Sequence, residues 1–331
     1  MSKDNYISIK QLNEILEKIK NLVVGKAIMT TYHKLNNCGY EKVLCSISGG
    51  SDSDIVLDIV NFCDNKGIVD YVFFDTGLEY QATKDHIKFL EEKYDINIKI
   101  IKPKIPIPLS CKKYGQPFMN KNVSNMIQRL QSHNFKWEDK SFDELIKEYP
   151  SCKCALKWWT NTNPSPAHNI KNNKYLKEFM IKNPPKFKIS DKCCKYAKKD
   201  LVHNEMKKGY DLDISGVRKA EGGVRATAYK SCFDNGDKYD NYRPIFWFKE
   251  EDKRYYEEMF NIVNSKCYTE YGLKRTGCCG CPFSKNLNFE INILKDYEPK
   301  LYNAVINVFK DSYDYTLQYK KFRLEKELKE V

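Results

Sequence analysis

The chain has 331 residues, of which 41% are hydrophobic and 30% are charged, and its formal net charge is +12. This length allows one large domain or two small ones, and the composition is that of an ordinary globular protein. No apolar run approaches the roughly 20 residues that span a bilayer, and the start MSKDNYISIK lacks a signal-peptide core, so we expect a cytoplasmic protein without a membrane partner.

The source of the positive charge allows two interpretations. Nearly all of it is lysine, in a chain that is also rich in asparagine. That pairing is typical of an AT-rich genome, which we take as the main cause of the charge, since a phosphate-binding face needs clustering that the sequence alone does not show. The sign is also compatible with a nucleic-acid partner. The 13 cysteines have a clearer meaning. In a reducing compartment they are better explained as metal ligands, thiols and small buried residues than as a disulfide framework.

The first hundred residues alternate between helix and strand patterns. Apolar residues at helical spacing predict one amphipathic helix from about Ile9 to Leu35. The segments that follow are predicted as strands at 42–47, 71–74 and 96–101 and as helices at 54–62 and 79–94. Such alternation predicts an α/β protein, with a parallel twisted sheet covered by helices on both faces.

The remainder of the chain is less regular. Three prolines between 103 and 108 break the pattern, a polar helix is predicted at 122–131, and a fourth strand at 211–215. The stretch from Ser151 to Pro185 is rich in Asn, Pro and Lys and predicts an insertion or a long loop, which holds Cys152 and Cys154. We expect an N-terminal helix at 1–40, a central domain at 41–285 with an insertion at about 105–190, and a helical tail at 286–331.

A glycine loop follows the first strand and opens a helix. Its residues are Ser48, Gly49, Gly50, Ser51, Asp52 and Ser53. Two glycines let the backbone turn tightly and approach a ligand, and the amino end of the helix attracts phosphate. The serines add hydroxyl donors, and Asp52 is suited to hold Mg²⁺ against the phosphates or to brace the loop. Because the Gly-Lys-Ser/Thr of a Walker loop is absent, we predict a phosphate cradle of another kind.

Four cysteines have the makings of an iron–sulfur site. They are the adjacent Cys193 and Cys194, and the pair Cys278 and Cys281, a C-x-x-C followed by proline. Four thiolates suit either a [4Fe–4S] cluster or Zn²⁺, and a third alternative is that they are free, buried thiols. Adjacent cysteines bind one tetrahedral ion poorly, whereas a cubane offers separate iron corners, so the spacing favours the cluster over zinc. Cys279 stands either as a substitute for Cys278 or as a bystander.

Three motifs, taken in order, resemble the phosphoadenosine phosphosulfate (PAPS) reductase family of the PP-loop ATP-pyrophosphatase-like proteins. They are the glycine loop, Asp75-Thr76-Gly77 after the second strand, and Gly216-x-Arg218-x-x-Glu221-x-x-x-Arg225. The adjacent cysteines and the C-x-x-C pair are separated by 83 residues. This separation is similar to that of the [4Fe–4S] cysteines in the adenylylsulfate-reducing branch of the family. The segments 115–125 and 187–194 resemble members from phages and mobile elements. The resemblance covers about residues 40–285.

The resemblance implies an adenine nucleotide alpha hydrolase-like fold with helical additions at both ends. It implies that ATP or a related adenine nucleotide lies over the sheet, with its phosphates on residues 48–53, Mg²⁺ near Asp52, and Asp75-Thr76-Gly77 and Gly216 beside it. Arg218 and Arg225 would face the pyrophosphate or sulfate and, together with Asp52, carry the catalysis.

Two departures from the family pattern bear on activity. No cysteine follows Cys281, so the family's tail thiol is missing, and Gly222 stands where the family has serine. We therefore predict ATP pyrophosphatase or sulfurtransferase chemistry, with nucleic acid as a candidate acceptor. One alternative is an adenylylsulfate or PAPS reductase that uses the thiol of a partner. Another is a nonenzymatic nucleotide- or cluster-sensing protein of a defence or mobile-element system. A sulfur-donor or thiol partner protein and an oligomer are both compatible with these readings.

Overall fold

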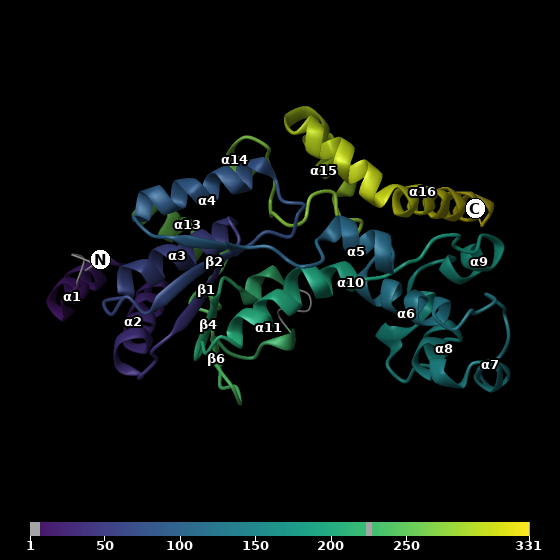
Figure 1. The fold of residues 1–331 in the computed structure, drawn as a ribbon, viewed down its shortest axis with the longest axis horizontal. Coiled ribbons are helices and arrows are strands. Elements are labelled where there is room, and N and C mark those ends of the chain that lie inside the picture. The colour runs from purple at the N-terminus through teal and green to yellow at the C-terminus, as the bar shows by residue number, and fades with distance from the viewer. Residues whose placement is uncertain (1–6, 223–226, 331) are drawn as a thin grey trace. The chain divides into compact units, whose positions relative to one another are not determined.

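The computed structural model of the chain describes residues 7–222 and 227–330. Its residues form two compact units, which we call the sheet unit and the helical unit (Figure 1). The sheet unit consists of Met1–Asp75, Glu79–Pro103 and Asp200–Gly277. The helical unit consists of Thr76–Leu78, Lys104–Lys199 and Cys278–Val331. Each unit is therefore assembled from separate parts of the sequence.

The sheet unit is built on a six-stranded sheet of order β3-β2-β1-β4-β6-β5. Its strands are β1 (Val43–Ile47), β2 (Val69–Phe74), β3 (Ile98–Ile101), β4 (Leu212–Ser215), β5 (Phe233–Asp234) and β6 (Asp240–Tyr242). All described pairings are parallel except the one between β5 and β6. The parallel, helix-covered sheet predicted from the alternating pattern is confirmed, and the short β5 is its antiparallel edge.

Alternate side chains of a strand point to opposite faces of the sheet, and in β1 both sets contain buried residues. The core on one face includes residues of α2 and α3, and it contains Val43, Cys45 and Ile47. Leu44 packs instead with Met206 on the other face. The helices of this unit are α1 (Ile9–Lys18), α2 (Leu22–Asn37), α3 (Ser51–Cys63), α4 (Gln81–Tyr94), α11 (Asp200–Met206), α13 (Glu250–Met259), α14 (Lys266–Thr269) and the 3₁₀ turn η5 (Lys219–Glu221).

The single helix predicted from Ile9 to Leu35 is wrong, because two helices occupy this segment. The backbone becomes extended at Ile19, which ends α1. The Asn21 side chain then accepts hydrogen bonds from the N–H groups of Val23 and Val24 and starts α2. Such a cap begins a new helix. The apolar spacing continues through this break, so periodicity alone does not reveal it.

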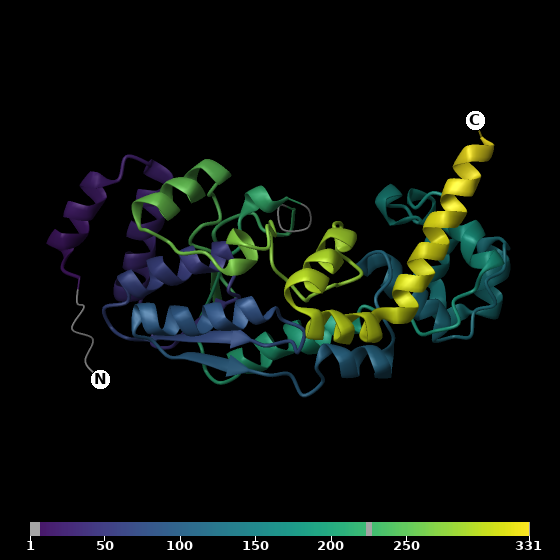
Figure 2. The same ribbon diagram turned by 90° about the horizontal axis from the view of Figure 1, so that it is seen from above.

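The helical unit consists mainly of short helices and ends in one long helix. They are α5 (Ile107–Tyr114), α6 (Lys121–Gln131), α7 (Phe142–Glu148), α8 (Lys153–Trp159), α9 (Leu176–Lys182), α10 (Lys192–Cys194), α15 (Leu287–Tyr297) and α16 (Pro299–Lys329). Single turns connect them, namely η1 (Pro150–Cys152), η2 (Pro166–His168), η3 (Ile170–Asn172) and the π-type turn η4 (Lys195–Lys199). Figure 2 shows α16 as the long yellow helix. Among the described residues, no helix has both the length and the apolar character that crossing a membrane requires.

Of the two alternatives predicted for Ser151 to Pro185, an insertion or a long loop, the long loop is wrong, because this stretch forms part of a packed core. Trp158, Trp159 and Phe179 are almost completely buried. The indole N–H of Trp159 donates a hydrogen bond to the carbonyl oxygen of Glu138 at 2.9 Å. The helices here are too short for a clear helical period, and the Asn and Pro residues between them resemble loop sequence. The insertion therefore adds a second hydrophobic core.

Candidate functional site

The glycine loop connects β1 to α3 at the carboxyl end of the central strand, the position where parallel sheets bind ligands. Gly49 has a φ of +63°, and a Cβ atom there would lie 2.8 Å from a methyl carbon of Thr83, so the turn requires glycine. The Ser53 hydroxyl accepts hydrogen bonds from the N–H groups of Ser48 and Gly50, both at 3.2 Å. These bonds hold the loop closed at the start of α3, whose first amides have no partner within the helix.

The loop lines an open hollow of about 290 Å³ within the sheet unit. Besides loop residues, its lining consists of Gly216, Arg218, Glu221, Glu250, Lys253, Tyr268, Lys274, Arg275 and Thr276. Four of these side chains are cations, and the hydroxyls of serine, threonine and tyrosine add further donors. Cations and donors around the amino end of a helix form a site suited to phosphate groups.

Two cations hold Asp52 in place. Arg218 Nε lies 2.8 Å from one carboxylate oxygen of Asp52, and Lys253 Nζ lies 3.2 Å from the other. Arg218 also pairs with Glu250 at 2.8 Å and is itself buried. Burial acts to lower the pKa of Arg218, but the bonds and charges of Asp52 and Glu250 raise it overall, so the guanidinium stays charged. In this arrangement Asp52 braces the cations, and its contact with Mg²⁺ stays a prediction.

A buried hydrogen bond between two side chains supports the loop from behind. His86 on α4 lies 2.8 Å from Asp54, the residue that follows the loop. Burial raises the pKa of Asp54, and the hydrogen bond from His86 opposes that rise. The pair ties α3 to α4 at the level of the phosphate cradle. Asp54 is thus a structural partner of His86 and is not among the residues that line the hollow.

Sequence reasoning missed Lys253, Tyr268 and Thr276. The Tyr268 hydroxyl lies 3.2 Å from Thr276 Oγ1, and both groups face the loop near Gly50. Lys253 follows the acidic residues that begin α13, where a lysine resembles an ordinary solvent-facing residue. None of the three stands in a recognisable motif. One signal was available in the sequence: arginine is rare in this chain, and one of the few arginines, Arg275, belongs to the same lining.

The remaining nucleotide residues predicted from the sequence have different positions. Gly216 and Arg218 line the hollow, whereas Asp75, Thr76 and Gly77 are not part of its lining. Asp75 is buried at the end of β2 and pairs with Lys84 at 3.5 Å. In the helical unit, Thr76 Oγ1 lies 3.7 Å from the sulfur of Cys278. Arg225 lies outside the described residues.

All four predicted cluster cysteines belong to the helical unit. A hydrogen bond with Cys193 raises the pKa of the Cys194 thiol, and burial adds to the rise. Burial raises the pKa of Cys281 to about 12, and the neighbouring Cys278 and Cys194 add to it. Thiols influence one another's charge in this way only at short range. The fold therefore brings the adjacent pair and the C-x-x-C pair into one neighbourhood.

A metal centre would require these thiols to converge on it. Among the described residues, no group of three or more His, Cys, Asp or Glu side chains could hold a metal ion. A zinc ion needs its sulfur ligands about 2.3 Å from a single point. A cubane binds each thiolate at its own iron atom. Thiols from two segments, one buried and three partly exposed, fit the donor chemistry of a cluster, and the cluster itself stays a prediction.

The packing around C-x-x-C separates Cys279 from its neighbours. Cys279 is fully buried, and its N–H donates a hydrogen bond to the Leu78 carbonyl oxygen at 2.9 Å. Gly280 has a φ of +56°, and a side chain there would collide with Val305. The turn thus directs Cys279 into the core, while Cys278 and Cys281 remain partly exposed. This packing favours Cys278 over Cys279 as a ligand.

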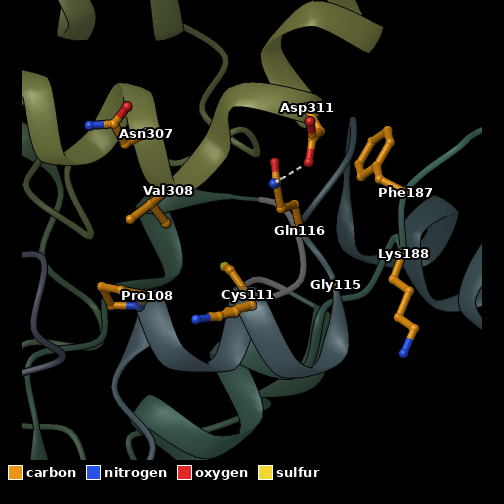
Figure 3. A pocket seen from close by; sticks show the side chains of 10 residues that line it. Pro108, Cys111, Gly115, Gln116, Phe187, Lys188, Asn307, Val308 and Asp311 are labelled. Carbon is orange, nitrogen blue, oxygen red and sulfur yellow. Dashed lines mark hydrogen bonds between the residues drawn. The ribbon is translucent and has the colours of Figure 1, made fainter.

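A fifth thiol, Cys111 on α5, lies beside the predicted site and was missed by sequence reasoning. Its hydrogen bond with Cys193 is the main cause of the raised pKa of that thiol. Backbone bonds from Gln116 to Lys188 (2.8 Å) and from Ser190 to Gln116 (2.9 Å) join the end of α5 to the segment before α10. Cys111 also lines a cavity of about 530 Å³, where the Gln116 amide donates to Asp311 at 3.0 Å (Figure 3). Cys111 stands alone among proline-rich residues, so no spacing pattern marks it.

Comparison with known proteins places the chain among distant relatives. Two uncharacterized proteins of Methanocaldococcus jannaschii are 24% identical over 298 residues and 26% identical over 289 residues. The matches cover 90% and 86% of this chain but 53% and 44% of those proteins, so the chain spans about half the length of the curated relatives it matches.

Among solved structures, the chain is similar to a PAPS reductase from Candida auris in a phosphate complex, with a TM-score of 0.40, 12% identity and coverage of 82% of this chain and 96% of that one. It is also similar to a U34-tRNA thiolase from Methanococcus maripaludis with its [4Fe–4S] cluster, with a TM-score of 0.39, 14% identity and coverage of 92% and 80%. An NH₃-dependent NAD synthetase from Campylobacter jejuni has a TM-score of 0.37 at 14% identity, with coverage of 91% and 96%.

The match to a protein family is extensive. Residues 42–284 match the phosphoadenosine phosphosulfate reductase domain, a stretch that includes the glycine loop, the arginine motif and all four predicted cluster cysteines. This stretch is well over half of the chain. The chain therefore belongs to the phosphoadenosine phosphosulfate reductase domain family.

Proposed function

We propose that this protein is an ATP pyrophosphatase of the PP-loop class that activates an acceptor for the insertion of sulfur. One observation carries the proposal. The hollow of the sheet unit places the amino end of α3, Arg218 and Lys253 around one small volume, with Lys274 and Arg275 also in its lining. A bound pyrophosphate group would therefore meet amides, hydroxyls and cations together.

The nature of the cations favours release of pyrophosphate over transfer of a terminal phosphate. The loop lacks the lysine with which Walker-type loops bind the β- and γ-phosphates. Arg218 is held by Asp52 and Glu250 before any ligand arrives. A guanidinium that is already oriented stabilises developing negative charge with little reorganisation. This suits attack at the α-phosphorus, with pyrophosphate as the leaving group.

In the activation step, an acceptor oxygen attacks the α-phosphorus of ATP, the α–β bond breaks, and an adenylated acceptor and pyrophosphate form. A sulfur nucleophile then attacks the acceptor carbon, a carbon–sulfur bond forms, and AMP leaves with the oxygen. A [4Fe–4S] cluster bound by Cys193, Cys194, Cys278 and Cys281 would supply an iron site for sulfide. The chain's own contribution to activation is to bind and orient the phosphates through the residues of the hollow.

The test is product analysis after incubation of anaerobically purified protein with ATP and Mg²⁺. We expect AMP and pyrophosphate in equal amounts, and we expect Lys253→Met to abolish their formation. Lys249→Met is a matched control, since Lys249 precedes the same helix and its side chain is 73% exposed outside the hollow. ADP as the product would overturn the proposal. Nucleotide binding without turnover would do the same and would favour the nonenzymatic sensing alternative.

A further inference from the structure

The net positive charge of this chain is confined to one of its two units. The sheet unit contains 27 Lys and Arg against 29 Asp and Glu, a net charge of −2. The helical unit contains 29 against 15, a net charge of +14. A genome-wide preference for lysine would raise the charge of both units alike. The uneven distribution therefore points to a polyanionic partner of the helical unit.

Part of this charge lies on α5, α10 and the turn η4, which contact one another, and at the start of α6; α10 also carries Cys193 and Cys194. The lysines concerned, which we call the lysine collar, are Lys112, Lys113, Lys121, Lys192, Lys195, Lys198 and Lys199. Lys121 and Lys198 are close enough to Cys194 to act on the charge of its thiol, and Lys198 also acts on Cys281. In the described part of the chain, Lys112, Lys113 and Lys192 make no ion pair with a carboxylate. These ammonium groups are thus available to external phosphates.

Two aromatic rings lie among these lysines. Tyr114 and Tyr196 are stacked, with ring centroids 4.8 Å apart and an angle of 28° between the ring planes. Lys113 Nζ and Lys192 Nζ lie 5.2 Å and 5.0 Å from the centroid of Tyr114, and Lys195 Nζ lies 5.5 Å from that of Tyr196. Both tyrosines are partly exposed. Aromatic rings interleaved with cations offer stacking for unpaired bases and contacts for the phosphates between them.

We propose that the lysine collar and the Tyr114–Tyr196 stack bind single-stranded nucleic acid. An acidic protein would use the lysines but has no base to stack on the rings, and a duplex keeps its bases stacked inside. The inference deepens the proposed function, because a strand bound here would lie beside Cys193 and Cys194 as an acceptor. It rests on residues of the helical unit alone and needs neither ATP nor a cluster for its test.

The test is fluorescence anisotropy of the full chain with a labelled 20-nucleotide single strand, in salt from 50 to 200 mM. We expect the triple variant Lys113→Glu, Lys192→Glu, Lys195→Glu to bind at least tenfold more weakly and with a flatter dependence on salt, because phosphate contacts are lost. We expect Tyr114→Leu to weaken binding about tenfold while leaving the salt dependence unchanged, because it removes stacking alone. Lys147→Glu, Lys153→Glu, Lys171→Glu is the matched control, with three exposed lysines of the same unit.

Several outcomes would overturn the inference. They are equal binding by the collar variant and its control, equal binding of a duplex, and binding of an acidic peptide but not of the single strand. A milder collar variant with glutamine at the same three positions should show an intermediate loss, provided that its thermal midpoint matches that of the wild type. The collar variant should still convert ATP without acceptor as the wild type does. Strand binding without ATP turnover would contradict the proposed function alone, and turnover without strand binding would contradict this inference alone.

Discussion

The charged residues of the two units are arranged differently. In the sheet unit, charges near the site are matched, since Asp52 contacts Arg218 and Lys253, and Arg218 also contacts Glu250. In the helical unit, the lysine collar has an excess of cations around thiols. Matched charges hold a rigid site for a small anion, because each partner fixes the other. An excess of surface cations suits a long anion, whose binding is driven by the release of counterions.

This difference predicts different responses to mutation. A change in the sheet unit should disturb the shape of the nucleotide site, with large losses that depend little on salt. A change in the lysine collar should reduce the affinity for single-stranded nucleic acid in proportion to the charge removed. This loss should disappear at high salt. Experiments on single residues can separate these two kinds of site.

The largest expected effect is that of Gly50→Val on nucleotide binding. A Cβ atom at Gly50 would lie 3.1 Å from the Tyr268 hydroxyl, 3.2 Å from Ser48 Oγ and 3.3 Å from Thr276 Oγ1. Valine adds two further methyl groups at the point where the phosphate must approach, so we expect no measurable ATP binding by calorimetry. Gly25→Ala is the control, because a Cβ atom there meets only ordinary contacts at 3.7 Å or more. Wild-type affinity in Gly50→Val would refute the phosphate cradle.

The second prediction concerns the cysteines of the helical unit. Cys281→Ser should remove iron and sulfide from anaerobically purified protein, whereas Cys279→Ala should retain them, because Cys279 is packed in the core. Chemical iron and sulfide analysis with absorption spectroscopy provides the measurement. Equal loss in both variants would show that the ligand is Cys279 and not Cys278. Stoichiometric zinc without iron in the wild type would contradict the cluster and support the zinc alternative.

The third prediction separates sulfur insertion from sulfonate reduction. Given thioredoxin or glutathione, the protein should not release sulfite from adenylylsulfate or PAPS at an enzymatic rate, because none of the described residues that line the hollow is a cysteine. Cys267 and Cys279 are fully buried, so neither can supply the attacking thiol without a rearrangement. Sulfite release measured by a colorimetric assay would contradict this prediction. If Cys111→Ser then abolished the release, the cavity beside Cys193 would hold the reducing thiol.

The sheet unit could be predicted from the sequence more completely than the helical unit, for physical reasons. A buried parallel strand such as Val43–Ile47 is a short apolar run, and the glycine loop has a local backbone requirement that sequence displays. Lys253 and Cys111 reach their sites through tertiary packing, which no local pattern records. The core around Trp158 and Trp159 was concealed by short helices that lack a full apolar period.

The smallest expected effect tests whether the charges of the sheet unit are matched throughout. Asp213 on β4 is an exception, since one of its carboxylate oxygens is buried without a hydrogen-bond partner among the described residues. Burial raises the pKa of Asp213 to about 6, although Arg243 and Ser46 oppose the rise. A carboxyl group with a raised pKa binds a proton more tightly in the folded state, so its stability contribution is full at low pH and is lost as the pH rises through about 6.

Asp213→Asn should therefore stabilise the protein at pH 7.5, by on the order of 2 kcal/mol, and should have little effect near pH 4.5. Thermal unfolding at a series of pH values measures this difference. Asp237→Asn is the control, because Asp237 is exposed and should give the same small change at every pH. A stabilisation by Asp213→Asn that is equal at both pH values would mean that folding does not raise the pKa of Asp213, because the folded and unfolded chains would then bind the same number of protons. Destabilisation at pH 7.5 would mean instead that its attraction to Arg243 outweighs the cost of burial, so that even this charge of the sheet unit is matched.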